Sequence, residues 1–65
     1  MKAIDKVMEH ESRNNSANWI QVLIGNSRVT IDPSKYCVKA STLQKQANSE
    51  GFKTTTWGDE IQLYR

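Results

Sequence analysis

The sequence has very few of the residues that cross-link a small protein or hold a metal. Its 65 residues include one cysteine, Cys37, and one histidine, His10. A single cysteine excludes an internal disulfide, and one cysteine with one histidine cannot supply the ligands of a structural zinc site from one chain. We therefore expect no bound metal and no cofactor, and we expect packing or self-association to provide the stability.

Long apolar runs are also absent. No stretch approaches the ~20 apolar residues that cross a bilayer, and the first residues lack the apolar segment of a signal peptide. The sequence therefore predicts a cytoplasmic protein that does not enter a membrane.

Patterns typical of enzymes are absent as well. No serine or cysteine has a basic partner at a recognisable spacing, and His10 falls on a helix that we expect to be exposed. Cys37 is interpreted as a small buried apolar residue rather than a nucleophile. A chain of this length buries only roughly 60% of the surface that its unfolded form exposes, which leaves little room for an enclosed active site. We therefore expect a protein that is not an enzyme.

The charge is only mildly basic. Nine Lys and Arg residues against seven Asp and Glu give a net charge of +2, well short of the excess typical of a small protein that coats DNA non-specifically. The middle of the chain is locally basic, because residues 34–52 contain three lysines, Lys35, Lys39 and Lys45, and only one acidic residue, Glu50. This balance permits nucleic acid as a partner without requiring it.

What the sequence does contain is one pattern that occurs twice: a run of β-forming residues, a two-residue turn that begins with glycine, and a second run that can pair with the first. The first copy spans residues 19–32 around Gly25-Asn26, and the second spans residues 52–65 around Gly58-Asp59. Glycine followed by a small polar residue suits the tight turns of β-hairpins, whose central residues need positive φ. The sequence therefore predicts two hairpins.

A short amphipathic helix is expected over residues 1–12, where Ile4, Val7 and Met8 recur at helical spacing. Residues 12–18 are rich in Asn and Ser and are typical of a connector. The first helix is thus either loosely docked or packed over one face of the sheet.

A turn or single helical turn is expected after Asp32-Pro33, and a second helix over residues 41–50. Ser41 and Gln44 match the capping box that begins a helix, and Gly51 is a stop signal. The order of elements is then α-β-β-α-β-β, which predicts one α+β domain over residues 1–65 with a four-stranded antiparallel sheet.

Alternation along the expected strands sorts their side chains onto two faces. The apolar set of each hairpin is expected to face the helices. The other face gathers aromatic, basic and apolar side chains: Trp19, Leu23, Arg28, Lys53, Trp57 and Tyr64. Aromatic groups among basic ones on an open sheet can stack bases and hold phosphates. We therefore predict nucleic-acid binding through this face, with Lys39 as a further phosphate contact.

Two alternatives use the same face. Trp, Tyr and Arg are also enriched at the centres of protein interfaces, which would suit an inhibitor or modulator of a host complex. The aromatic face would otherwise form the seam of a homodimer.

The chain from Trp19 onward resembles small uncharacterised proteins common in bacteriophages and related mobile elements. The matching residues are Trp19, Gly25, Val29, Leu43, Ala47, Gly51, Lys53 and Thr56. The resemblance implies a phage-type accessory protein that binds nucleic acid or a host protein in the host cytoplasm, without catalysis. It supplies no site residues.

Overall fold

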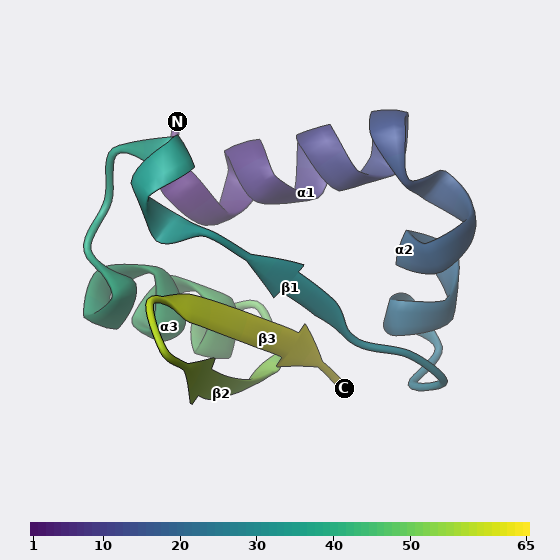
Figure 1. Ribbon diagram of the computed structural model, residues 1–65. Helices are drawn as coiled ribbons and strands as arrows, with labels where there is room; N and C mark the ends of the chain where they lie inside the picture. The colour runs from purple at the N-terminus through teal and green to yellow at the C-terminus, as the bar shows by residue number, and fades with distance from the viewer.

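The computed structural model describes residues 1–65 as a layer of helices packed on a three-stranded antiparallel sheet. The helices are α1 (Ala3–Asn14), α2 (Ser16–Leu23), the short 3-10 helix η1 (Pro33–Tyr36) and α3 (Ala40–Ser49). The strands are β1 (Val29–Ile31), β2 (Lys53–Trp57) and β3 (Glu60–Tyr64). Figure 1 shows α3 behind β2 and β3, with α1 and α2 beyond β1. The predicted α+β class is confirmed.

The predicted four-stranded sheet is wrong, because residues 19–24 do not form a strand. They belong to α2 and the end of that helix, and the sheet has the order β1-β3-β2. The connector predicted over residues 12–18 is also wrong, because α1 continues to Asn14 and α2 begins at Ser16.

The first glycine turn ends a helix instead of joining two strands. Gly25 has φ of 87°, its N–H donates to the carbonyl of Val22, and the N–H of Asn26 donates to the carbonyl of Gln21. These two bonds form a Schellman motif, which requires the same positive φ as a hairpin turn. Trp19 and Val22 are buried one helical turn apart, so the core selects the helix.

The second hairpin forms as predicted. Its turn contains Gly58 at φ of 62°, and the strands pair in the expected register: Lys53 with Tyr64, Thr55 with Gln62, and Trp57 with Glu60. The segment after Asn26 pairs with the other edge of β3 instead of with residues 19–24. The last strand is therefore the central one.

The first helix is docked firmly on the helical layer. Ile4 and Val7 are fully buried, and the N–H of Ile4 donates to Oε1 of Gln46 in α3 over 3.0 Å. The neighbours of α1 are α2, η1 and α3. It therefore does not cover the far face of the sheet.

The second long helix lies within one residue of its predicted bounds. Leu43 and Ala47 are buried as expected. The helix is capped by Lys39 without a side-chain hydrogen bond, so the predicted capping box at Ser41 is wrong. The helix ends just before the predicted stop signal at Gly51. The N–H of Phe52, beyond this glycine, donates to the carbonyl of Ala47 over 3.0 Å.

The turn predicted after Asp32-Pro33 is a short 3-10 helix. Both the N–H and the hydroxyl of Ser34 donate to Oδ1 of Asp32, over 3.0 and 2.8 Å. Cys37 follows this turn with φ of 54° and is exposed, so its predicted burial is wrong.

One apolar cluster holds the two layers together. It comprises Ile4, Val7, Trp19, Val22, Val29, Ile31, Leu43, Ala47, Phe52, Ile61 and Leu63. Glu11 is buried beside it, and its Oε2 has no hydrogen-bond partner in the protein. Burial, and to a smaller extent the negative charge of Glu11, raises the pKa of the Tyr36 hydroxyl above its usual value. None of the helices has the length and apolar character that crossing a bilayer requires.

The two tryptophans differ in burial, and this difference predicts a large loss of stability for one substitution and almost none for the other. Trp19 is 5% exposed and Trp57 is 69% exposed. We expect Trp19→Ala to lower the free energy of unfolding by about 3–5 kcal/mol, a large share of the stability of a chain whose total is roughly 0.05–0.15 kcal/mol per residue. Trp57→Ala should change it by about 0.5 kcal/mol or less. Urea denaturation of both variants checks this, and equal losses would contradict the assignment.

The hydrogen bonds around Asp32 predict a pH dependence of stability. The hydroxyl of Ser34, followed by its N–H, lowers the pKa of the Asp32 carboxyl below its usual value. A carboxyl with a lowered pKa in the folded state stabilises the protein above its unfolded pKa, and this contribution is lost as the pH falls. We expect Asp32→Ala to reduce the loss of stability between about pH 5 and pH 2. Denaturation at both pH values, with Asp59→Asn as the control at another exposed turn, measures the effect.

A candidate nucleic-acid interface on the open face of the sheet

The two faces of the sheet have different surroundings. Val29, Ile31, Ile61 and Leu63 are buried under the helices. Alternation places the side chains that lie between these along each strand on the opposite side, which we call the open face. The open face comprises Arg28, Thr30, Lys53, Thr55, Trp57, Glu60, Gln62 and Tyr64.

One end of the open face brings an aromatic side chain between two cations. Tyr64 in the central strand pairs with Lys53 on β2. On its other side the guanidinium of Arg28 lies over the Tyr64 ring, with Cζ 4.3 Å from the ring centre. A cation at this distance is attracted by the electrons of the ring. The three side chains therefore form a row across the sheet.

Hydrogen bonds hold this row in place. Nη1 of Arg28 donates to Oε1 of Gln62 over 3.4 Å, and the Tyr64 hydroxyl lies 3.2 Å from Oγ1 of Thr55. Gln62 and Thr55 are themselves neighbours in the sheet, and Thr30 lies beside Gln62 on β1. The middle of the open face is thus polar, and it fixes the positions of Arg28 and Tyr64.

The opposite end of the open face has a different charge. Trp57 and Glu60 are paired directly across β2 and β3, and Asp59 lies in the turn between them. A hollow of about 420 Å³ near this turn is lined by Asp32, Asp59 and five uncharged residues. The acidic groups are therefore gathered at the end of the sheet that carries the exposed tryptophan.

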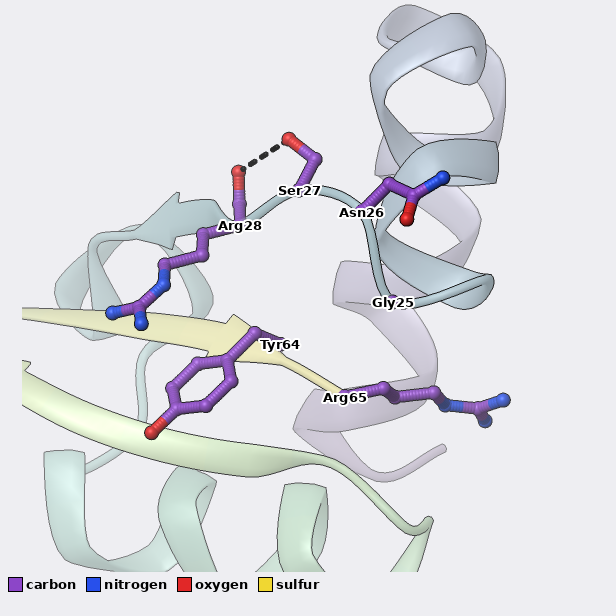
Figure 2. Close-up of a pocket in the computed structure, with 6 residues that line it drawn as sticks. All are labelled: Gly25, Asn26, Ser27, Arg28, Tyr64 and Arg65. Atoms are coloured by element: carbon purple, nitrogen blue, oxygen red, sulfur yellow. Dashed lines mark hydrogen bonds between the residues drawn. The ribbon is translucent and has the colours of Figure 1, made fainter.

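A second hollow lies at the cationic end of the sheet (Figure 2). It measures about 230 Å³ and is lined by Gly25, Asn26, Ser27, Arg28, Tyr64 and Arg65. In Figure 2 the segment from Gly25 to Arg28 passes above Tyr64 and Arg65 at the end of β3. No carboxylate side chain lines this hollow.

The cations of this region have no carboxylate partners. The protein's one ion pair joins Arg13 to Glu9 within α1. Arg28, Lys53 and Arg65 therefore keep their charge available to an anionic ligand.

The structure brings together four of the side chains predicted for the interface: Arg28, Lys53, Trp57 and Tyr64. The remaining three lie elsewhere. Trp19 is a core residue in contact with Phe52, their ring centres being 5.5 Å apart. Leu23 lies on α2 with 36% exposure, and Lys39 precedes α3, which packs on the covered face of the sheet.

Sequence reasoning missed Arg65 and the loop from Gly25 to Ser27. Alternation along β3 places Arg65 on the same side of the sheet as the covered residues Ile61 and Leu63. Its side chain extends over the ring of Phe52, with Cζ 4.7 Å from the ring centre. No pattern in the sequence indicates this contact, because it depends on α2 ending beside β3.

No group of three or more His, Cys, Asp or Glu side chains gathers in a way that could hold a metal ion. Comparisons of the chain with protein-family models, with curated proteins and with solved structures gave no match. The resemblance to bacteriophage proteins therefore stays a prediction.

Proposed function

We propose that the open face binds single-stranded nucleic acid. The observation that carries the proposal is the row formed by Arg28, Tyr64 and Lys53, in which two cations without carboxylate partners flank an aromatic ring. Backbone phosphates are bound by such cations, and bases stack on aromatic rings and on guanidinium planes.

The two aromatic residues have different roles in this proposal. One face of the Tyr64 ring is covered by Arg28, so Tyr64 supports the guanidinium, and the outer side of that guanidinium receives a base. Trp57 is 69% exposed and offers its ring directly. Lys53 contacts a phosphate as a flexible point charge.

The spacing of these groups suits a short stretch of strand. Lys53 and Trp57 are four residues apart on β2, which corresponds to about 13 Å along the strand. The protein-bound segment would therefore be a few nucleotides long. An unpaired strand fits better than a duplex, because its bases are free to stack on the exposed ring of Trp57 and on the Arg28 guanidinium.

The charge difference between the ends gives the bound strand a preferred position. Glu60 and Asp59 repel phosphates near Trp57, whereas Arg28 and Lys53 attract them at the other end. We therefore expect the backbone to lie toward Arg28, with a base reaching Trp57.

The phosphate contact predicts a specific change in salt dependence. Each phosphate contact adds about 0.7 to the slope of log K against log salt concentration for a single strand. We expect Lys53→Gln to weaken binding of an oligonucleotide and to reduce this slope by about 0.7. Lys45→Gln removes the same charge from the exposed side of α3 and should leave the slope unchanged. Fluorescence titration at several salt concentrations measures both, and equal slopes for all three proteins would sink the proposal.

Stacking predicts a fluorescence response from one tryptophan only. In Trp19→Phe, where Trp57 is the reporter, we expect an oligonucleotide to quench the emission to saturation. In Trp57→Phe the buried Trp19 should respond weakly. Quenching confined to the second variant would show that no base reaches the open face.

A protein partner is the second candidate function, and a different surface favours it. Ile20 and Leu23 on α2 and Ile24 at its C-cap are 56%, 36% and 62% exposed. Exposed apolar groups at this spacing are typical of a helix face that packs on another protein. If Ile24→Glu alters self-association in light scattering while oligonucleotide binding persists, α2 and the open face have separate partners.

A further inference from the structure

We infer that the free edge of β2 is a self-association surface, at which two copies of the chain pair their β2 strands antiparallel about a two-fold axis at Thr55. The sheet is then continuous through both copies, and both open faces lie on the same side of it. This seam differs from the aromatic face, which stays free for a ligand.

The outer edge of β2 has unpaired backbone groups. In the strand order β1-β3-β2 its only partner is β3, and Figure 1 shows no helix or loop beyond it. The two-residue turn at Gly58 closes with Trp57 and Glu60 as a hydrogen-bonded pair, and such pairs alternate along a hairpin. The N–H and carbonyl groups of Thr54 and Thr56 therefore point away from β3. No loop or helix of the protein bonds to them.

This edge lacks most of the features that prevent edge-to-edge pairing, which are proline, bulges, charged residues and very short strands. β2 has five residues, contains no proline and stays in register with β3 throughout. The other edge of the sheet differs, because β1 has only three residues and Pro33 follows it closely. The edge that is free to pair is therefore that of β2.

The strand is complementary to itself in one register. Pairing Thr54 with Thr56 of the second copy gives every outward group of these residues a partner, and the two-fold axis then passes beside Thr55. Centring the pair on Thr54 would place Phe52 opposite Thr56, but the N–H of Phe52 already bonds to α3. Centring it on Thr56 would use Gly58, which lies in the turn at φ of 62°.

The same register matches charge across the seam. The one charged residue of β2 is Lys53, and the axis places it opposite Trp57 of the second copy, with Cβ atoms roughly 5 Å apart. A cation beside an exposed indole ring is attracted by its electrons. Asp59 and Glu60 lie next to Trp57, so the cationic end of each copy lies beside the acidic end of the other. This complementarity, made twice, favours a second copy of the chain as the partner.

The second copy also contributes a residue to the candidate site, a consequence that rests on the proposed function. Within one chain, Lys53 and Trp57 are about 13 Å apart along β2. Across the seam, Trp57 of the second copy continues the row formed by Arg28, Tyr64 and Lys53. A phosphate bound by the cations of one copy then lies beside the stacking ring of the other.

The first experiment measures self-association by sedimentation and light scattering over a range of protein concentrations. Thr56→Pro removes an outward N–H but no bond to β3, which is a position that proline tolerates. We expect it to raise the dimer dissociation constant on the order of tenfold or more, because the two-fold axis removes the bond twice. Thr30→Pro makes the same change at the β1 edge, where the N–H also points outward, and should leave the constant unchanged. Backbone amide NMR spectra check the fold of both variants.

The second experiment reads the register directly and does not depend on how the strand tolerates proline. At the axis, Thr55 faces Thr55 of the second copy with Cα atoms about 4.5 Å apart, within the range of a disulfide. With the exposed Cys37 replaced in Cys37→Ser, we expect Thr55→Cys to give a disulfide-linked dimer under mild oxidation. Thr30→Cys in the same background should stay monomeric.

The outcomes separate this seam from other contacts. Cross-linking through position 55 but not through position 30 supports the seam, even if Thr56→Pro fails to fold. The seam is wrong if the protein is monomeric at every concentration and position 55 does not cross-link. It is also wrong if Ile24→Glu dissociates the dimer and Thr56→Pro does not, since the copies then meet through α2.

The seam and the proposed function fail in different ways. If the dimer forms through position 55 and no oligonucleotide binds, the seam stands and the nucleic-acid function is refuted. If Thr56→Pro is monomeric and binds an oligonucleotide as tightly as the unmutated protein, the function stands and the contribution of the second copy to the site is refuted.

Discussion

The contact between Trp19 and Phe52 is the one on which the rest of the structure depends. It joins α2 to the residue that follows α3 and precedes β2, with ring centres 5.5 Å apart. Aromatic pairs at this distance add to the area that they bury. The same Phe52 ring lies under the guanidinium of Arg65. The core contact that fixes α2 is therefore connected, through one shared ring, to the cation at the edge of the candidate site.

The glycine turns show how far local sequence determines this fold. Gly58 joins two strands and Gly25 ends a helix, although each supplies the same positive φ followed by a small polar residue. Local chemistry predicts that the chain turns at each point, but not which element precedes the turn. That choice is made at long range. Residues 19–24 could alternate as a strand, but as a helix they bury Trp19 and Val22 together.

The part of the candidate site that could be predicted is the part in which a short turn sets the register between two strands. The turn at Gly58 fixes which residues of β2 and β3 are paired, so Lys53, Trp57 and Tyr64 reach the open face as alternation requires. Arg28 also reaches the open face. Residues 28 and 30 lie on the same side of their strand, and this holds whichever strand they pair with. Trp19 could not be placed correctly by a strand pattern, because its position follows from helical spacing.

The order of the strands affects how the chain can fold as it is made. Both β1 and β2 find their hydrogen-bonding partners only in β3, so no part of the sheet can form until residues 60–64 have been synthesised. Until then the helices have no sheet to pack on, and their apolar residues Ile4, Val7 and Trp19 stay exposed. Pairing across this sequence distance slows folding and prolongs the exposure of apolar surface. On the ribosome, the protein is therefore expected to gain its structure in one late step, and a chain stopped within the Gly58 turn would leave that surface open to chaperones and proteases.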